Sequence, residues 1–234
     1  RLGGTASQHA LLAGQTNSGK STLLHTLILG LCAKYSPAEL QLLLVDMKEG
    51  GVEFSVYRHL PHARVVAMAS DRDFGISVLR SAVSEMAARG LLFPQGVSKF
   101  ERYREVVGAL PRILVVVDEF QLLFEASVAG EALAAEANQL LDRIAATGRA
   151  YGIHFLLATQ SLVAETGTFL TTRTQSQCAL RIALKMNTER DAAHILLHHP
   201  ADALRLKTGE AVYEDNVANP EGNVAFKVAY ADND

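Results

Sequence analysis

The sequence has little cysteine, no excess of positive charge and no long hydrophobic run, and each absence excludes a class of protein. Cys32 and Cys178 are the two cysteines among 234 residues, too few for a disulfide framework or a four-cysteine zinc site. The 22 Lys and Arg residues and 25 Asp and Glu residues give a net charge of −3, which excludes binding to nucleic acid through overall positive charge. The longest apolar stretch, Leu23 to Ala33, is interrupted by polar residues and is shorter than the about 20 residues that a membrane span requires. We therefore expect no membrane span in this chain.

The composition and length are typical of a globular domain. Hydrophobic residues make up 49% and charged residues 20% of the chain, which is ordinary for a folded protein with a sizeable core. The chain begins with Arg1 rather than Met. We therefore expect residues 1–234 to form a single domain that is a fragment of a longer chain.

Apolar strands and amphipathic helices alternate along the sequence. The pattern predicts strands at residues 9–13, 40–45, 63–68, 113–117, 153–158, 178–184, 211–213 and 223–228, and helices at residues 21–34, 71–92 and 131–146. Several of these strands are apolar throughout, which is typical of strands covered on both faces. The sequence therefore predicts an α/β fold with a mainly parallel central sheet flanked by helices.

A glycine-rich segment follows the first predicted strand and matches the pattern G-x-x-x-x-G-K-[ST] at every fixed position. The predicted nucleotide-binding residues are Gly14, Gln15, Thr16, Asn17, Ser18, Gly19, Lys20, Ser21 and Thr22. The two glycines let the backbone wrap closely, so that several N–H groups can point at phosphates. The helix that follows adds the positive end of its dipole. We expect Lys20 to contact the outer phosphates of ATP and the Ser21 hydroxyl to bind Mg²⁺.

Two adjacent acids follow the most apolar predicted strand. Asp118 and Glu119 come directly after the run Leu-Val-Val-Val. A phosphate loop needs an acidic partner for its metal ion and a group that orients the attacking water. We expect Asp118 to bind Mg²⁺ and Glu119 to act as general base, which favours ATP hydrolysis over nucleotide binding alone.

A third polar residue ends the next strand. Gln160 follows the run Leu157-Ala158-Thr159, and we expect it to lie beside the strand that carries the two acids. It could donate a hydrogen bond to the γ-phosphate and transmit the loss of that phosphate to the loop that follows. The alternative is an ordinary polar residue at a strand end.

Several multi-residue blocks resemble, in order and spacing, the motor domain of the FtsK/SpoIIIE family, within the HerA–FtsK class of RecA-like P-loop ATPases. The blocks are residues 15–22, 44–48, 53–57, 60–62, 85–89, 96–97 with Tyr103, 116–120, 149–154, 158–160 and 181–183 with the region of Gly209. The resemblance implies a RecA-like fold and a ring ATPase, usually hexameric, that draws double-stranded DNA through its centre. It also implies a cytoplasmic location, either free or tethered to the membrane by segments outside this chain.

Other functions remain open. Met47 stands where the family usually has proline, and ATPases of type VII secretion systems, which move proteins, share the phosphate loop and the Leu60-Pro61-His62 block. The segment 53–57 favours the DNA-motor branch. A third hypothesis is a nucleotide-gated assembly or defence scaffold that hydrolyses ATP slowly.

The resemblance also suggests arginines that act between subunits and basic residues that contact DNA. Arg149 and Arg181 lie in family-like blocks and are candidates to meet the γ-phosphate of a neighbouring subunit, although either could instead form a surface ion pair. The candidates for DNA contacts are Arg173, in the polar loop expected from Ser161 to Gln177, and the basic stretch that contains Lys99, Arg102 and Arg104.

Overall fold

The computed structural model describes residues 8–48, 53–68, 72–124, 130–164, 167–215 and 222–229. Its centre is a sheet of eight strands in the order β10-β9-β8-β1-β5-β4-β2-β3. The strands are β1 (Ala10–Ala13), β2 (Leu40–Asp46), β3 (Ala63–Met68), β4 (Arg112–Asp118), β5 (Ile153–Thr159), β8 (Leu180–Leu184), β9 (Glu210–Glu214) and β10 (Val224–Lys227). The strands from β8 to β3 in this order pair in parallel, whereas β9 and β10 are antiparallel. The expected α/β fold with a mainly parallel sheet is confirmed.

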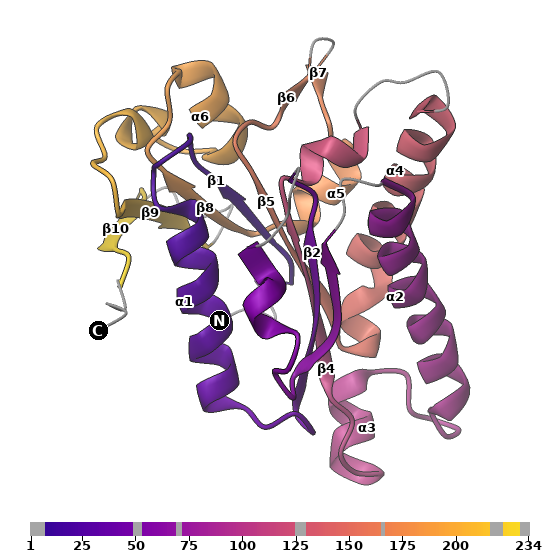
Figure 1. Ribbon diagram of the computed structural model, residues 1–234. Helices are drawn as coiled ribbons and strands as arrows, with labels where there is room; N and C mark the ends of the chain where they lie inside the picture. Colours follow the sequence, from indigo (N-terminus) through magenta and orange to yellow (C-terminus); the bar gives the residue numbers. More distant parts are fainter. Residues whose placement is uncertain are drawn as a thin grey trace.

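Helices cover both faces of the sheet (Figure 1). The α-helices are α1 (Lys20–Lys34), α2 (Arg72–Leu92), α3 (Phe100–Val106), α4 (Gly130–Thr147), α5 (Thr172–Gln177) and α6 (Glu189–Ile195). Short 3-10 helices are η1 (Glu53–Tyr57), η2 (Phe120–Phe124), η3 (Gly148–Tyr151) and η4 (Pro200–Leu204). The first residue of the helix expected from 71 to 92, Asp71, lies outside the described residues.

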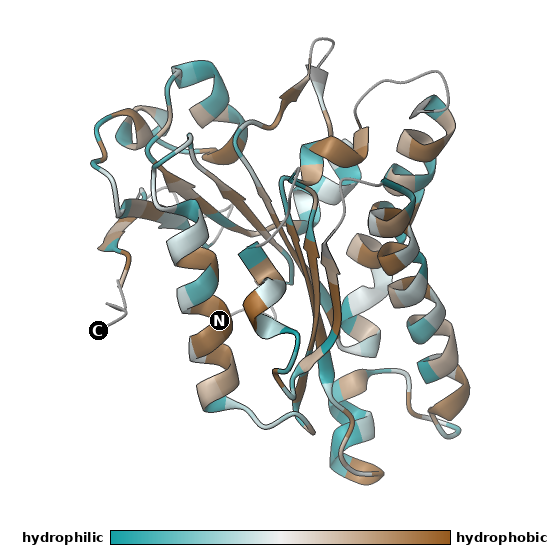
Figure 2. Ribbon diagram, in the orientation of Figure 1, coloured by the Kyte–Doolittle hydropathy of each residue, from teal (hydrophilic) through white to brown (hydrophobic). Residues whose placement is uncertain are grey.

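Side chains of the central strands alternate between two apolar clusters. In β4, Leu114 and Val116 pack with α1 and η1 on one face, whereas Val115 and Val117 pack with α2 and α4 on the other. Such strands are apolar on both faces, and Figure 2 shows the centre of the sheet as uniformly hydrophobic. This explains why the central strands could be predicted from continuous apolar runs rather than from alternation.

Several segments differ from the prediction, among them α3 and α6, which are not among the predicted helices. The stretch 161–177 is not a loop throughout, because it contains the short strands β6 (Val163–Ala164) and β7 (Gly167–Thr168) and helix α5. The hydroxyl of Thr171 accepts a hydrogen bond from the Thr174 amide at 3.2 Å and caps α5. Cys178 does not begin β8, which starts two residues later. Polar side chains that cap a helix resemble loop residues in a sequence, which is why α5 was not predicted.

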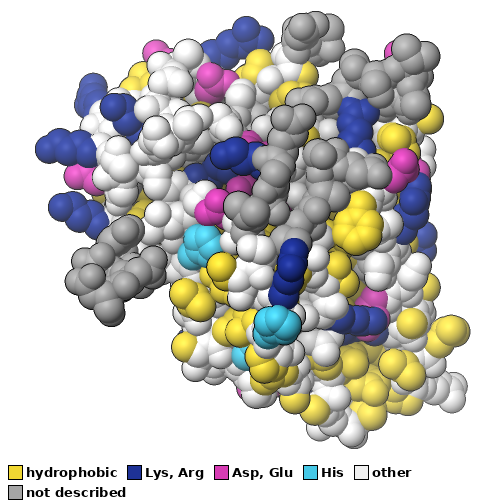
Figure 3. Space-filling view, viewed as in Figure 1, with side chains coloured by type: hydrophobic (Ala, Val, Ile, Leu, Met, Phe, Trp, Pro, Cys, Tyr) yellow, Lys and Arg dark blue, Asp and Glu magenta, His cyan; other side chains and the backbone are white. Residues whose placement is uncertain are grey.

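The two ends of the sheet differ in character. The phosphate loop precedes α1 at the upper end in Figure 1, and α3 lies at the lower end. Exposed apolar residues include Leu91 and Leu92 at the end of α2, and Val106 and Val107 at the end of α3. Figure 3 shows hydrophobic side chains gathered at the lower end of the same face.

Among the described residues, no helix has both the length and the hydropathy that crossing a membrane would require.

Candidate active site

The predicted site residues meet where three neighbouring strands end. Strands β1, β5 and β4 are adjacent and parallel, and Ala13 at the end of β1 pairs with Thr159 at the end of β5. The carboxyl ends of parallel strands share one edge of the sheet, where ligands of open α/β sheets bind. The strand order therefore brings the phosphate loop, Gln160 and the two acids together.

The phosphate loop is anchored on both sides. The Gly14 amide donates to the Thr159 carbonyl at 3.2 Å, and the Gln15 amide donates to the carbonyl of Lys185, which follows β8, at 2.9 Å. A side chain at Gly14 would force its neighbours to shift, because its Cβ would lie 2.6 Å from the Ser18 hydroxyl and 2.9 Å from Leu184 Cβ. Gly19 has φ +102°, a left-handed conformation that favours glycine. The local structure therefore explains why the motif requires glycine at both positions.

Several amides at the start of α1 are available to a ligand. The backbone N–H groups of Gly19, Lys20, Ser21 and Thr22 have no acceptor among the described residues. Gly19 is the N-cap of α1, and no side chain caps the helix. The first N–H groups of a helix lack partners within the helix and form a ready site for anions. The loop can therefore bind phosphate oxygens without first breaking backbone hydrogen bonds at these amides.

Lys20 extends from α1 to both acids at the end of β4. Its ammonium donates to Asp118 Oδ1 and, at 2.9 Å, to Glu119 Oε1. All three side chains are nearly buried, with exposed fractions of 8%, 5% and 7%. Burial disfavours the ammonium, but the charges of the two acids outweigh it and raise the pKa of Lys20 above its ordinary value. Lys20 therefore stays charged at this site.

Glu119 accepts hydrogen bonds from three elements. Besides Lys20, Gln160 Nε2 donates to Oε1 at 3.0 Å and Gln121 Nε2 donates to Oε2 at 2.7 Å. Burial raises the pKa of Glu119, but Lys20, Gln121 and Gln160 together lower it below its ordinary value. Glu119 also has φ +51°, an uncommon conformation for a residue other than glycine. The carboxylate is thus ionised and held in place.

Gln160 connects the phosphate loop to the acids. Its Oε1 accepts a hydrogen bond from the Thr16 hydroxyl at 2.9 Å, while its amide donates to Glu119. Gln160 itself is exposed. It therefore lies between the loop and the acids, as the sequence predicts, with direct contacts to both.

Ser21 and Asp118 offer suitable oxygens for a magnesium ion. The Ser21 hydroxyl and the second carboxylate oxygen of Asp118 take part in no hydrogen bond among the described residues. Mg²⁺ prefers hydroxyl, carboxylate, phosphate and water oxygens. The donor set at the edge between α1 and β4 therefore fits this ion.

The position of Arg181 does not fit the prediction that its side chain meets the γ-phosphate of a neighbouring subunit. Arg181 has an exposed fraction of 3%, and its guanidinium donates to the carbonyls of Gln175, Cys178, His194 and Ile195. These carbonyls lie at or near the carboxyl ends of α5 and α6, where helices leave acceptors unpaired. Arg181 therefore joins two helix ends inside its own chain.

Arg149 is the other arginine predicted to meet the γ-phosphate of a neighbouring subunit. It lies in η3, is partly exposed and comes shortly before β5 begins. The start of β5 is the edge of the sheet opposite the phosphate loop. Arg149 therefore cannot reach the site of its own chain, and its action at a neighbouring site stays a prediction beside the alternative of a surface ion pair.

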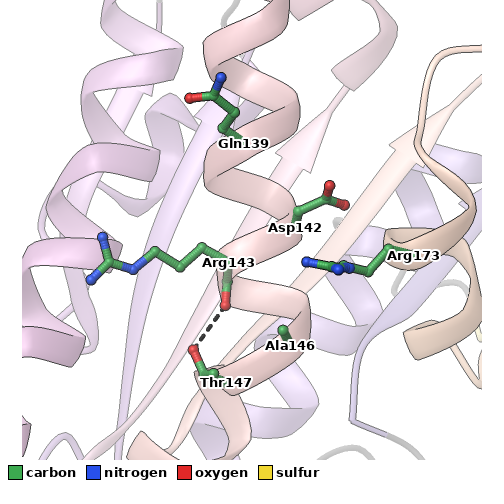
Figure 4. A pocket seen from close by; sticks show the side chains of 6 residues that line it. All are labelled: Gln139, Asp142, Arg143, Ala146, Thr147 and Arg173. Atoms are coloured by element: carbon green, nitrogen blue, oxygen red, sulfur yellow. Dashed lines mark hydrogen bonds between the residues drawn. The ribbon is translucent and has the colours of Figure 1, made fainter.

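The candidates for DNA contacts lie on two helices. Lys99 and Arg102 are exposed at α3, where Arg102 pairs with Glu105 and Arg104 lies over the Phe100 ring. Arg173 is exposed on α5 and lines a pocket of about 350 Å³ between α4 and α5. Figure 4 shows Arg173 extending towards Asp142, whereas Arg143 points away.

Two contributors to the site were not predicted. Gln121 contacts Glu119, and the buried Thr159 donates from its hydroxyl to Gln121 Oε1 at 2.7 Å. Gln121 directly follows the block 116–120, and Thr159 lies inside the block 158–160, but neither residue was given a role of its own. The only signal in the sequence was their position, next to the acids and next to Gln160.

Comparison with protein families gives a match over more than half of the chain. The FtsK/SpoIIIE family matches residues 3–164. The secretion system protein EccCa1 (ESX-1) of Mycobacterium tuberculosis is 33% identical over 94% of this chain and 29% of its own length. The DNA translocase FtsK of Clostridium tetani is 31% identical over 91% of this chain and 28% of its own length. The chain thus spans less than a third of these curated relatives.

A solved structure shows the same fold. The cytoplasmic domain of the type VII secretion ATPase EccC from Thermomonospora curvata superposes with a TM-score of 0.78 and is 28% identical. The similarity covers 95% of this chain and 25% of that one. The fold of this chain is accordingly that of a P-loop ATPase domain.

Proposed function

This chain belongs to the FtsK/SpoIIIE family of RecA-like P-loop ATPases, and from that premise we propose that it is the ATP-hydrolysing motor domain of a ring that translocates double-stranded DNA. One observation carries the proposal: the ammonium of Lys20, on the phosphate loop, meets Asp118 and Glu119 at the end of β4. Binding and hydrolysis groups therefore share one small volume, as phosphoryl transfer requires.

The phosphate loop binds ATP. The unpaired amides at the start of α1 donate to phosphate oxygens, and Lys20 contacts the outer phosphates. When its ammonium moves to the phosphates, Glu119 Oε1 loses one of its two donors. Nucleotide binding thereby exposes the oxygen that hydrolysis uses.

Glu119 acts as general base. Oε1 takes a proton from a water molecule whose oxygen attacks the γ-phosphorus, while the bond from the γ-phosphorus to the bridging oxygen of ADP breaks. Gln160 donates to the γ-phosphate from the end of β5. Ser21 and Asp118 would hold Mg²⁺, which supplies positive charge to the phosphate oxygens when it is bound.

Gln160 connects hydrolysis to movement. It contacts Thr16 in the loop and Glu119, and the β6–β7 hairpin begins three residues after it. Loss of the γ-phosphate shifts Gln160 and this hairpin, and a subunit interface passes the shift to the polymer. The proposal includes a hexameric ring, an interface that Arg149 completes, DNA contacts from Arg173, Lys99, Arg102 and Arg104, and a cytoplasmic location, free or tethered through segments outside this chain.

A second candidate is a protein-translocating ATPase. The identity to EccCa1, 33%, is slightly higher than that to the Clostridium tetani DNA translocase, 31%, and the EccC domain has the same fold. The same hydrolytic site would then serve a protein substrate. The two candidates differ in which polymer stimulates hydrolysis.

The test compares ATP turnover by the purified chain with and without duplex DNA. We expect DNA to raise turnover several-fold. Unchanged turnover with DNA but stimulation by a secreted protein from the same organism would select the second candidate. Slow turnover that neither polymer changes would contradict both and would indicate a nucleotide-gated scaffold.

Two variants separate binding from hydrolysis in the same assay. Lys20→Ala should abolish ATP binding, because it removes the ammonium that faces the phosphates. Glu119→Gln should keep ATP bound and unhydrolysed, because an amide cannot accept the proton from water. Retained turnover in Glu119→Gln would remove Glu119 from its role as general base, and thermal unfolding of both variants controls for folding.

A further inference from the structure

Gln121 is the one described residue that contacts the second carboxylate oxygen of Glu119. Lys20 and Gln160 both donate to Oε1, whereas Gln121 Nε2 donates to Oε2 at 2.7 Å. We propose that Gln121 is a positioning residue for ATP hydrolysis, which holds Oε2 so that Oε1 stays directed at the nucleotide. This inference rests on the proposed function and adds a residue to the same site.

Hydrogen-bond chemistry fixes the orientation of the Gln121 amide. An ionised carboxylate can only accept hydrogen bonds, so the NH₂ group of Gln121 must face Glu119. The amide oxygen then faces the opposite way, where the Thr159 hydroxyl donates to it at 2.7 Å. The reverse orientation would set the amide oxygen against a carboxylate. Glu119 and Thr159 therefore hold Gln121 from both ends.

Thr159 is itself firmly placed. It has an exposed fraction of 0% and ends β5, and its hydroxyl oxygen accepts from the Ser161 amide at 3.1 Å. The Ser161 carbonyl lies 2.6 Å from the same hydroxyl, which has one hydrogen and can donate to only one acceptor at a time. The hydroxyl hydrogen of Thr159 is therefore shared between the Ser161 carbonyl and Gln121 Oε1. Through this hydroxyl, Gln121 is linked to the turn that carries Gln160.

The network continues from this turn to α6. The Ser161 hydroxyl donates to Asp191 Oδ1 at 2.6 Å, and Asp191 Oδ2 accepts from the N-cap residue Thr188, also at 2.6 Å. The Ser161 hydroxyl also accepts from the Val163 amide at the start of β6 at 3.0 Å. Gln121 therefore joins Glu119 to two elements far along the chain, and its placement does not depend on η2 alone.

The position of Gln121 matters most when ATP is bound. Lys20 then turns to the phosphates, and Gln160 has the γ-phosphate as a competing partner. The donors on Oε1 are thereby reduced, while Gln121 on Oε2 remains. A small displacement of a reacting group is enough to slow a reaction by orders of magnitude. Loss of Gln121 should consequently slow hydrolysis and leave ATP binding intact.

The first experiment compares Gln121→Ala and Gln121→Glu with the wild-type chain. Removing a hydrogen bond to a charged group should lower kcat by about tenfold to a hundredfold, while the Kd for a non-hydrolysable ATP analogue stays within about twofold by the same argument. Gln121→Glu keeps the size of the side chain but cannot donate to Glu119, so its kcat should fall as well. Gln95→Ala, the same truncation in an exposed turn, is the matched control and should behave as wild type.

The second experiment tests the link through Thr159. Thr159→Val removes the hydroxyl and keeps the shape, so kcat should fall, whereas Thr159→Ser keeps the hydroxyl and should restore most of it. The double variant Gln121→Ala with Thr159→Val should be no slower than the slower single variant, because both changes interrupt one connection. Multiplying effects, or Thr159→Ser as slow as Thr159→Val, would contradict the link.

The outcomes separate this inference from the function on which it rests. Wild-type kcat in both Gln121 variants, or a loss of nucleotide affinity equal to the loss of kcat, would overturn the role of Gln121 alone. A wild-type chain without ATP turnover would overturn the proposed function and this inference with it. Thermal unfolding midpoints close to wild type exclude misfolding as the cause of a slower variant.

Discussion

Two buried histidines show how single residues carry the fold's dependence on pH. His9 precedes β1 and stacks on the ring of Phe155 at 4.1 Å, and its Nδ1 accepts from the Phe155 amide. His154 in β5 donates from Nδ1 to the Gln8 carbonyl at 2.8 Å. Burial, with the charge of His154 as a further cause, lowers the pKa of His9 to about 3, and burial lowers the pKa of His154 to about 4. Folding thus keeps both rings neutral.

The protein should lose stability in mild acid. Both pKa values are depressed from 6.5 in the folded state, so the unfolded chain binds more protons once the pH falls below 6.5. The contribution of the neutral rings to stability is then complete above that pH and decreases down to about pH 4 for His154 and about pH 3 for His9. Each histidine should contribute a slope of about 1.4 kcal/mol per pH unit in the free energy of unfolding. Urea unfolding at pH 7, 6 and 5 measures this slope.

Replacing one histidine should remove its share of the slope. His154→Asn keeps a donor near the Gln8 carbonyl but does not titrate, so the slope should fall by roughly one proton. His59→Asn, at an exposed position, should leave it unchanged. An unaltered slope in His154→Asn would show that the acid sensitivity arises elsewhere.

At the scale of elements, one glycine controls how α3 approaches the sheet. Gly152 connects η3 to β5 with φ +70°, a conformation that L residues adopt at a cost. A Cβ there would lie 2.5 Å from the ring of Phe100, the first residue of α3. That ring is fully buried, and the guanidinium groups of Arg89 and Arg112 lie within 5.7 Å and 5.0 Å of its centroid. The close contact between Gly152 and Phe100 therefore sets the position of α3.

Gly152→Ala should destabilise the fold without touching the active site. The left-handed backbone and the clash with Phe100 together should cost about 2–4 kcal/mol in the free energy of unfolding. The matched control is Gly30→Ala in α1, where a Cβ meets nothing within 4 Å and should stabilise by about 0.5–1 kcal/mol. Urea unfolding distinguishes the two, and equal stabilities would contradict the role assigned to Gly152.

At the scale of the whole molecule, the position of Arg149 leads us to expect that the site of an isolated chain differs from the site in an assembly. The site of a single chain contains Lys20, Glu119 and Gln160 on one edge of the sheet, whereas Arg149 lies towards the opposite edge. If the ring that we propose forms, Arg149 of one subunit would complete the site of the next. Complementation between two inactive variants then becomes possible.

Mixing subunits tests this expectation. Arg149→Ala and Lys20→Ala chains should each be nearly inactive alone. Their mixture should recover part of the turnover, because a Lys20→Ala subunit still offers Arg149 to its Arg149→Ala neighbour. The control replaces the Lys20→Ala chain by the double variant Lys20→Ala with Arg149→Ala, so that no subunit offers Arg149, and this mixture should recover nothing. A mixture as inactive as its parts would exclude Arg149 from the neighbouring site.

Local patterns along the chain predicted the order of the main elements and the principal residues of the site. Continuous apolar runs specify strands that are buried on both faces. The phosphate loop can be recognised because its motif lies within a few adjacent residues. Asp118, Glu119 and Gln160 could be assigned because each directly follows such a run, and a parallel sheet brings strand ends to one edge. A feature could be predicted from the sequence where the physical cause of that feature lies in residues that are adjacent along the chain.

Which side chains meet became known from the folded arrangement. Lys20 and Asp118 are 98 positions apart, and Thr16 and Gln160 are 144 apart, so the strand order β1-β5-β4 had to form before these contacts existed. The structure also buries Arg181 between helix ends, where the sequence suggested an exposed role, and it joins Gln121 to Glu119 and Thr159. The physical reason is that a hydrogen bond depends on distance and direction in space, which a sequence encodes only through the complete fold.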